Sequence, residues 1–340
     1  MTRATNWLTF VGLTVLACPY VSNAADTVAL AKRLHNAAEA SSIDDPSLKP
    51  WHLKMNVQLY DAKGNPSEQG TIEEWRTSDA SKRVYTTPSY TATEISTGKS
   101  LYRTKGQPPA PYLLDAALRF AVHPEAPVET IDKSHLKMKV ETFGTTSLDC
   151  ITMTQADYLP YPLPGQVPTS CLDPDMDQLR VSWYAPQVAT RTRTALFQGR
   201  RVGVTGIISI YGVKAISQQV DELKEASFDS QMFVPSSDLE ERSDDPVWVS
   251  TEAVANTAVR KIVPPMPPFI PNLQLPVTVM VAATIGKDGH IITADILASP
   301  NPKLSEAAVE TIRQWVYRPY LVNGIAVKIK TALRIHYGPY

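Results

Sequence analysis

The sequence has no excess of charge of either sign and no long apolar run. Its 33 lysines and arginines are balanced by 34 aspartates and glutamates, while 43% of its residues are hydrophobic. The balanced charge excludes a polybasic nucleic-acid-binding protein, and the apolar content excludes a disordered chain. The apolar run from Trp7 to Ala17 is well short of the ~20 residues that a membrane-spanning helix needs. No later segment is apolar enough to replace it, so we expect no membrane span in the mature chain.

The sequence also lacks the short motifs that mark common catalytic and metal sites. It contains no Gly-x-Ser-x-Gly, no Gly-x-x-x-x-Gly-Lys-Ser/Thr and no His-Glu-x-x-His motif, and its 6 histidines are scattered. We therefore predict a protein that is not an enzyme and that binds neither a metal ion nor a cofactor. An enzyme remains as an alternative only if distant residues assemble a site that no local motif marks.

The N-terminal segment has the features of an export signal. A basic residue precedes the apolar run, and Ser22-Asn23-Ala24 follows it at the place where signal peptidase cuts. Residues 1–24 are therefore predicted to be a secretory signal peptide. In the alternative interpretation, residues 15–18 (Val-Leu-Ala-Cys) are a lipobox, and acylated Cys18 becomes the membrane-attached N-terminus.

Removal of the signal peptide leaves Cys150 and Cys171 as the only cysteines of the mature chain. An even number of cysteines in an oxidising compartment predicts a disulfide, and neither residue has the neighbours of a redox or zinc site. The pair flanks the proline-rich segment 158–165, which cannot order itself by regular strand pairing. We expect the cross-link to hold this segment against neighbouring strands.

Residues 25–245 are predicted to form an α+β domain with a curved, half-barrel-like antiparallel sheet. Apolar residues at helical spacing predict a first helix over residues 25–42, which would cover the concave face, and a second helix over residues 112–122. Period-2 alternation predicts strands joined by tight turns. These strands are expected at residues 51–60, 70–75, 82–87, 91–96, 100–104, 136–141, 148–153, 179–184, 190–197, 201–211 and 214–223.

Residues 246–340 are predicted to form a second, smaller domain. Alternation over residues 277–285, a turn at Asp288-Gly289 and alternation over residues 292–296 predict a hairpin. A helical stripe that includes Leu304 and Ala308 follows, and Asn323-Gly324 then turns the chain into a final strand. The order is strand, strand, helix, strand.

The motifs of this second unit occur in a characteristic order. They are Val279–Ile285, Asp288-Gly289, Ser299-Pro300, Ala307-Ala308, Trp315-x-Tyr317-x-Pro319-Tyr320 and Asn323-Gly324. Together they resemble the C-terminal domains of TonB- and TolA-type periplasmic proteins over about residues 247–340. The Tyr-Pro-x-x-Ala segment that is common before the first strand of such domains is replaced here by residues 263–268. The resemblance implies a periplasmic protein of the kind found in Acidobacteria, with a TonB-like domain but no N-terminal membrane anchor.

In the proteins that this chain resembles, the last strand receives a short extended segment of an outer-membrane transporter. If this strand lies at a sheet edge, its unpaired backbone groups can accept a strand from a partner protein. Lys328, Lys330 and Arg334 would discourage random pairing. The predicted partner-binding residues are Ile325, Val327, Lys328, Ile329, Lys330, Thr331, Leu333, Arg334 and Ile335. The missing anchor argues against energy transduction by this chain itself.

The N-terminal half loosely resembles the LolA and LolB half-barrels, which carry lipoproteins through the periplasm. The alternative function is therefore a lipid or lipoprotein carrier that holds acyl chains between the sheet and the helix at residues 25–42. The same residues are also compatible with an ordinary packed core. The predicted cavity residues are Trp51, Leu53, Met55, Val57 and Leu59.

Arg191 and Arg193 are predicted to share one face of a strand. They could bind an anionic lipid head group or glycan there, or form the solvated face of the sheet.

Overall fold

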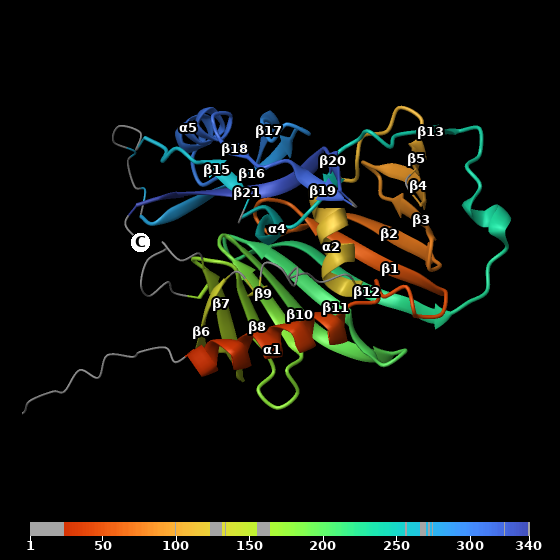
Figure 1. The fold of residues 1–340 in the computed structure, drawn as a ribbon, viewed down its shortest axis with the longest axis horizontal. Coiled ribbons are helices and arrows are strands. Elements are labelled where there is room, and N and C mark those ends of the chain that lie inside the picture. Colours follow the sequence, from red (N-terminus) through yellow and green to blue (C-terminus); the bar gives the residue numbers. More distant parts are fainter. Residues whose placement is uncertain are drawn as a thin grey trace, which may run out of the picture.

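The computed structural model describes residues 24–98, 100–122, 131–132, 134–154, 164–255, 257–265, 270, 273, 275–322 and 324–338 (Figure 1). The predicted lipobox, the signal peptide up to residue 23 and residues 158–163 of the proline-rich segment lie outside this range. In the described part, no helix is long and apolar enough to cross a membrane. No group of three or more His, Cys, Asp or Glu residues in that part could hold a metal ion.

The described residues of the N-terminal part (residues 24–245) form one antiparallel sheet of 13 strands, in the order β13-β5-β4-β3-β2-β1-β12-β11-β10-β9-β8-β7-β6. Its long curved surface is open, as the alternation predicted (Figure 1). Pairing between β1 and β12 joins two series of neighbouring strands. The strands are β1 (Trp51–Tyr60), β2 (Pro66–Arg76), β3 (Ala80–Thr86), β4 (Thr91–Thr97), β5 (Ser100–Thr104), β6 (His135–Phe143), β7 (Thr146–Thr154), β8 (Thr169–Leu172), β9 (Leu179–Tyr184), β10 (Gln187–Phe197), β11 (Arg200–Ile210), β12 (Val213–Glu225) and β13 (Leu239–Glu241).

Among the described residues, the α-helices α1 and α2 cover this sheet, but they cover other strands than predicted. Helix α2 (Tyr112–Val122) lies against β11 and β12 and buries Leu114 and Leu118 in the main core. Helix α1 (Ala24–Ser41) packs along β6, β9 and β11, where Leu34 joins a separate cluster. The helix that covers β1 is therefore α2, and the expectation that the first helix does so was wrong.

The predicted disulfide is confirmed. Cys150 on β7 lies directly opposite Cys171 on β8, and the two form a cross-link within the sheet. Both cysteines are fully buried in a small cluster with Leu148 and Val181.

The C-terminal part (residues 246–338) has its own core and a four-stranded sheet in the order β14-β21-β16-β17. Asn301 caps α5 by accepting a hydrogen bond from the backbone N–H of Lys303, and Pro302 begins the helix. The predicted strand-strand-helix-strand order is present, although the last strand is divided in two. The elements are η1 (Ser230–Phe233) before this part, then β14 (Val247–Trp248), α4 (Thr251–Ala255), β15 (Ala258–Arg260), β16 (Val277–Ile285), β17 (Ile291–Ala298), α5 (Pro302–Ile312), β18 (Val316–Tyr317), β19 (Tyr320–Val322), β20 (Ile325–Val327) and β21 (Ile329–Tyr337).

Candidate strand-binding site between the two parts

Strand β21 is not the open edge that the sequence led us to expect. It pairs with β16 over its whole length on one side, while the short strand β14 pairs in parallel with its first residues on the other side. The backbone N–H of Val247 donates to the carbonyl of Lys328 at 3.2 Å, and that of Val249 donates to the carbonyl of Lys330 at 2.9 Å. The premise of an unpaired edge is therefore corrected: a segment of the same chain covers the first residues of this edge.

The predicted partner-binding residues divide into three groups. Ile329, Thr331, Leu333 and Ile335 point into the C-terminal core, and Ile325 and Val327 lie on β20, which pairs with β19. The basic residues Lys328, Lys330 and Arg334 face residues 244–248 or the N-terminal part. Among the predicted residues 328–335, these three are the ones whose side chains can contact a strand added at this edge, because the other predicted residues of β21 are buried.

We call residues 244–251 the strap, since this segment crosses from the N-terminal part to β21. Toward the N-terminal part, the carboxylate of Asp245 forms an ion pair with the almost fully buried Arg103. The indole N–H of Trp248 donates to the carbonyl of Ala110 at 3.3 Å, and its ring lies 5.3 Å from that of Tyr112. An ion pair, a hydrogen bond and an aromatic contact thus hold the strap on this side.

Toward the C-terminal part, the strap is held by polar groups of β21 and the residues around it. Asp244 pairs with Lys287 at 2.6 Å and with Lys328 at 2.7 Å, and these two ammonium groups lower the pKa of its carboxyl to about 2. The hydroxyl of Thr251 donates to the carbonyl of Ala332 at 2.5 Å and accepts from Arg334 at 2.7 Å.

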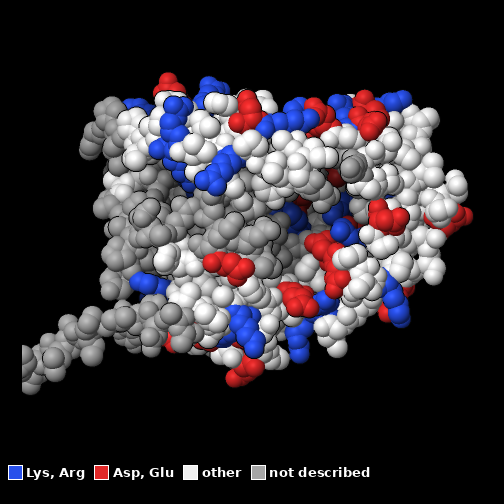
Figure 2. All heavy atoms as spheres, viewed as in Figure 1, with Lys and Arg blue, Asp and Glu red and all other residues white. Residues whose placement is uncertain are grey.

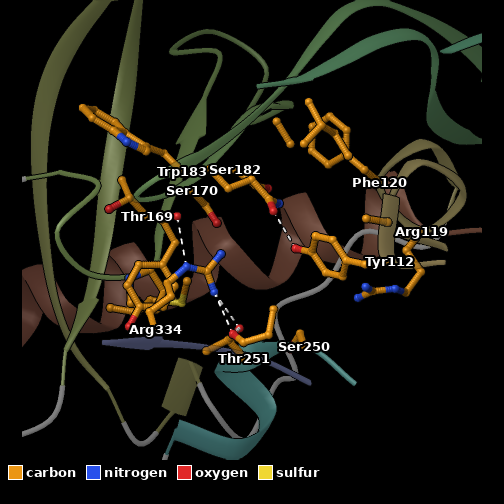
Figure 3. Close-up of a pocket in the computed structure, with 18 of the residues that line it drawn as sticks. Tyr112, Arg119, Phe120, Thr169, Ser170, Ser182, Trp183, Ser250, Thr251 and Arg334 are labelled. Carbon is orange, nitrogen blue, oxygen red and sulfur yellow. Dashed lines mark hydrogen bonds between the residues drawn. The ribbon is translucent and has the colours of Figure 1, made fainter. Parts of the chain in front are cut away.

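Arg334 connects the same edge to the N-terminal part. Its guanidinium lies 4.0 Å from the ring centroid of Tyr184 on β9, and its Nε donates to the carbonyl of that residue at 3.1 Å. Figure 3 shows Arg334 between the strands of the N-terminal sheet and Thr251 of the strap. A second contact between the parts joins the hydroxyl of Tyr211 to the carbonyl of Thr278.

A cavity lies at each end of the strap. The larger, of about 670 Å³, is lined by residues 243–248 together with β3, β4, β5 and β20. The smaller, of about 110 Å³, is lined by residues 249–251, by Ala332 and Arg334 of β21, and by β9 (Figure 3). The edge of β21 therefore continues from the strap into a pocket of mixed polar and apolar lining between the two parts.

Basic and acidic side chains both line the larger cavity. Figure 2 shows charged side chains of both signs around a hollow in the face of the molecule that it displays. Arg103 pairs with Glu94 at 2.7 Å as well as with Asp245, and Arg83 lies 3.2 Å from the buried carboxylate of Glu74. The charges are balanced only while the strap supplies Asp244 and Asp245 to Lys287, Lys328 and Arg103. A segment that replaces the strap in this cavity must therefore also replace these ion pairs.

The predicted acyl-chain cavity is filled by protein. Leu53 and Met55 are fully buried, so no space large enough for a water molecule borders them, and they pack in the same core as Leu118 of α2. Trp51 and Val57 are also buried, and Leu59 packs at the edge of this core. The five residues therefore form a packed core in this structure.

The prediction for Arg191 and Arg193 was wrong. A bulge in the pairing of β10 with β11 separates the two residues, so Arg193 is exposed while Arg191 is fully buried. The guanidinium of Arg191 donates from Nε and Nη2 to the carbonyl of Phe120, at 3.0 and 2.7 Å, and thereby caps the C-terminal end of α2. Gly203 leaves room for it, since a Cβ there would lie 3.1 Å from Nε of Arg191.

The C-terminal strands and helix match the model of a known family. Residues 273–339 match the family of the Gram-negative bacterial TonB protein C-terminal. The predicted resemblance is confirmed over this range, which contains β16, β17, α5 and β21 and leaves the strap outside. This match supports the interpretation that the protein belongs to the Gram-negative cell envelope.

The N-terminal part has weaker neighbours. A LolA superfamily protein from Nitrosomonas europaea is 10% identical, with a TM-score of 0.39, and the match covers 60% of this chain and 96% of that one. A DUF1329 family protein from Desulfovibrio piger is 7% identical, with a TM-score of 0.38 and coverage of 61% and 95%. No curated protein matches the chain.

Sequence reasoning missed the strap as part of the site next to the TonB-type domain. Val247-Trp248-Val249 is too short to show a strand period, and it follows a charged run that reads as a linker. The signal that was present is Trp248 itself, since a large aromatic residue in a polar linker usually has a binding partner.

Proposed function

We propose that this cell-envelope protein binds an extended segment of a partner protein, which adds as a strand to β21 of the TonB-type domain. The observation that supports this most directly is β14. A segment outside the matched domain already adds to β21 through two backbone hydrogen bonds. Such bonds do not depend on the added side chains, so the same edge can accept another extended chain.

The surroundings of the edge indicate where the partner segment would run. It would enter through the larger cavity, pair with residues 328–332 and continue into the pocket beside Arg334. The edge is reached from the surface at Lys328, whose side chain is one-third exposed. We propose a periplasmic location, reached through the predicted signal peptide, and an outer-membrane transporter as the class of partner.

The test uses the isotopically labelled mature chain and peptides from the periplasmic N-terminal segments of outer-membrane transporters. We expect NMR shift changes along Ile325–His336 and slower amide exchange in β21. A control peptide with proline at alternate positions should not bind, because proline has no N–H to donate. No change along residues 325–336 at millimolar peptide would contradict the proposal.

Native mass spectrometry of protein purified from the envelope separates this function from the carrier alternative. A peptide-binding protein should appear at the mass of the chain alone. Lipid that stays bound to the folded protein would support the carrier and would require the core around Leu53 to open.

A further inference from the structure

The strap contacts its surroundings as a bound peptide contacts a receptor. It supplies backbone donors to β21, an aromatic side chain to a slot beside Ala110, and two carboxylates to basic residues of both parts. We propose that the strap occupies the site of the partner segment, and that the partner segment has the same chemistry: acidic residues followed by an aromatic residue between aliphatic ones. This inference rests on the proposed function and names the partner's recognition features.

The strap pairs with β21 only weakly, as expected of a segment that a partner segment displaces. Strand β14 is only two residues long, it pairs in parallel, and Val247 is 51% exposed. Parallel pairing is slightly less stable per residue than antiparallel pairing. The cavities at both ends of the strap give an incoming chain room to contact β21 before the strap has left completely.

The aromatic slot gives the site its first element of selectivity. Trp248 contacts the ring of Tyr112, and the ammonium group of Lys330 lies over the indole ring, 5.2 Å from its centroid. A cation above an aromatic face is attracted to it, and the indole N–H has an acceptor in Ala110. An aliphatic side chain in this slot would keep the contact area but lose both polar interactions.

The basic residues that contact the strap give the site its second source of selectivity. Lys287 and Lys328 hold Asp244, and Arg103 holds Asp245, so positive charge meets the residues just before the aromatic one. Arg103 also pairs with Glu94, but its exposed fraction of only 2% makes loss of the second carboxylate costly. A partner segment without acids at these positions would deprive Lys287 and Lys328 of the ion pairs that Asp244 supplies and would leave Arg103 with Glu94 alone.

An intramolecular strap competes with any added peptide. A tethered segment has an effective concentration in the millimolar range, so it weakens the binding of a free peptide with equal contacts. A strap that is closed about 90% of the time reduces the apparent affinity about tenfold. Release of the strap should therefore reveal a site that the wild-type chain hides.

The probe is a dye-labelled peptide with the sequence of residues 244–251, measured by fluorescence anisotropy against the full mature chain. Val249→Pro removes the N–H that donates to Lys330, and Val249→Ala is the matched control because it keeps this N–H. We expect Val249→Pro to bind the peptide at least about tenfold more tightly than the wild type and Val249→Ala. Replacing the tryptophan of the peptide by serine, or both aspartates by asparagine, should weaken binding about tenfold.

Hydrogen exchange in the same variants separates the outcomes. Val249→Pro should speed exchange in β21 around residues 328–334 and leave β16 protected; if it unfolds β16 as well, Trp248→Ala replaces it with the same expectation. Tight binding of the peptide to the wild type, or equal affinity for the Pro and Ala variants, would overturn the strap as an occupant. If the strap peptide fails on the released chain while transporter peptides still shift β21, the inference is wrong and the proposed function stands; if neither peptide contacts β21, strand addition itself is wrong.

Discussion

Loss of the Cys150–Cys171 cross-link should destabilise the N-terminal part by about 3 kcal/mol. The cysteines are 21 residues apart in sequence, and for a loop of about that length the chain-entropy relation gives about 3 kcal/mol. Both sulfur atoms lie in an apolar cluster with Leu148 and Val181. Serines at both positions would bury hydroxyl groups there and add a desolvation cost, so Cys150→Ala with Cys171→Ala isolates the effect of the cross-link better.

Hydrogen exchange in increasing urea, read peptide by peptide, measures this prediction for each part separately. We expect β7 and β8 of the double alanine variant to lose protection at lower urea than in the wild type, while β16 and β21 keep theirs, because the two parts have separate cores. The wild type reduced under denaturing conditions is the control that keeps both sulfur atoms. A loss below about 1 kcal/mol would refute the chain-entropy reasoning, and simultaneous loss in β16 would refute independent domains.

Three further predictions test the packing. Arg191→Met should destabilise the N-terminal part by about 2 to 4 kcal/mol in urea unfolding, because buried carbonyls of α2 lose a charged donor, whereas Arg193→Met on the exposed side should change stability by less than about 0.5 kcal/mol. Leu53→Ala should cost about 2 to 5 kcal/mol if β1 packs in a solid core, and a cost below about 1 kcal/mol would indicate an unfilled cavity. Burial lowers the pKa of His336, whose Nδ1 lies 2.7 Å from Oγ1 of Thr278, so stability should fall as the pH drops below about 6.5, where the unfolded chain takes up a proton first. This loss between pH 7.5 and 5 should be smaller in His336→Gln.

Alternation was the most reliable guide to the fold. The strands expected at residues 51–60, 91–96 and 179–184 are β1, β4 and β9, with ends that agree within one residue. Tight turns and one buried face make such a pattern readable without tertiary information. Strand β8 was missed because Thr169–Leu172 is buried along its whole length and shows no alternation.

The choice of covering helix could not be made from the sequence. Both predicted helices have an apolar face, and a helical period does not say which part of a sheet it meets. The decision lies in contacts between distant residues, such as the bond from Arg191 to the end of α2, which fixes this helix over the sheet. A one-residue bulge turned Arg191 inward, and a bulge leaves no mark in a period-2 count.

The prediction that β21 is an open edge strand was wrong for a related reason. An edge strand and a strand covered by a two-residue neighbour have the same pattern, because pairing of backbone groups leaves side-chain alternation unchanged. The basic residues suggested an open edge, since lysines on edge strands keep other strands away. In this structure, Lys328 forms an ion pair with Asp244, and the ammonium group of Lys330 lies over the indole ring of Trp248.

Lys328 and Lys330 affect the pairing of a strand with β21 differently, depending on the charged and aromatic residues of that strand. A basic or purely aliphatic segment at β21 would bury lysine charge without a partner, and this penalty opposes its pairing. A segment with acids and an aromatic residue supplies the groups that Lys328 and Lys330 contact in the strap, so the same charges favour it. Under the proposed function, the cations that protect the edge against random strands would also select the strand that binds there, and a partner would have to offer at least what the strap offers.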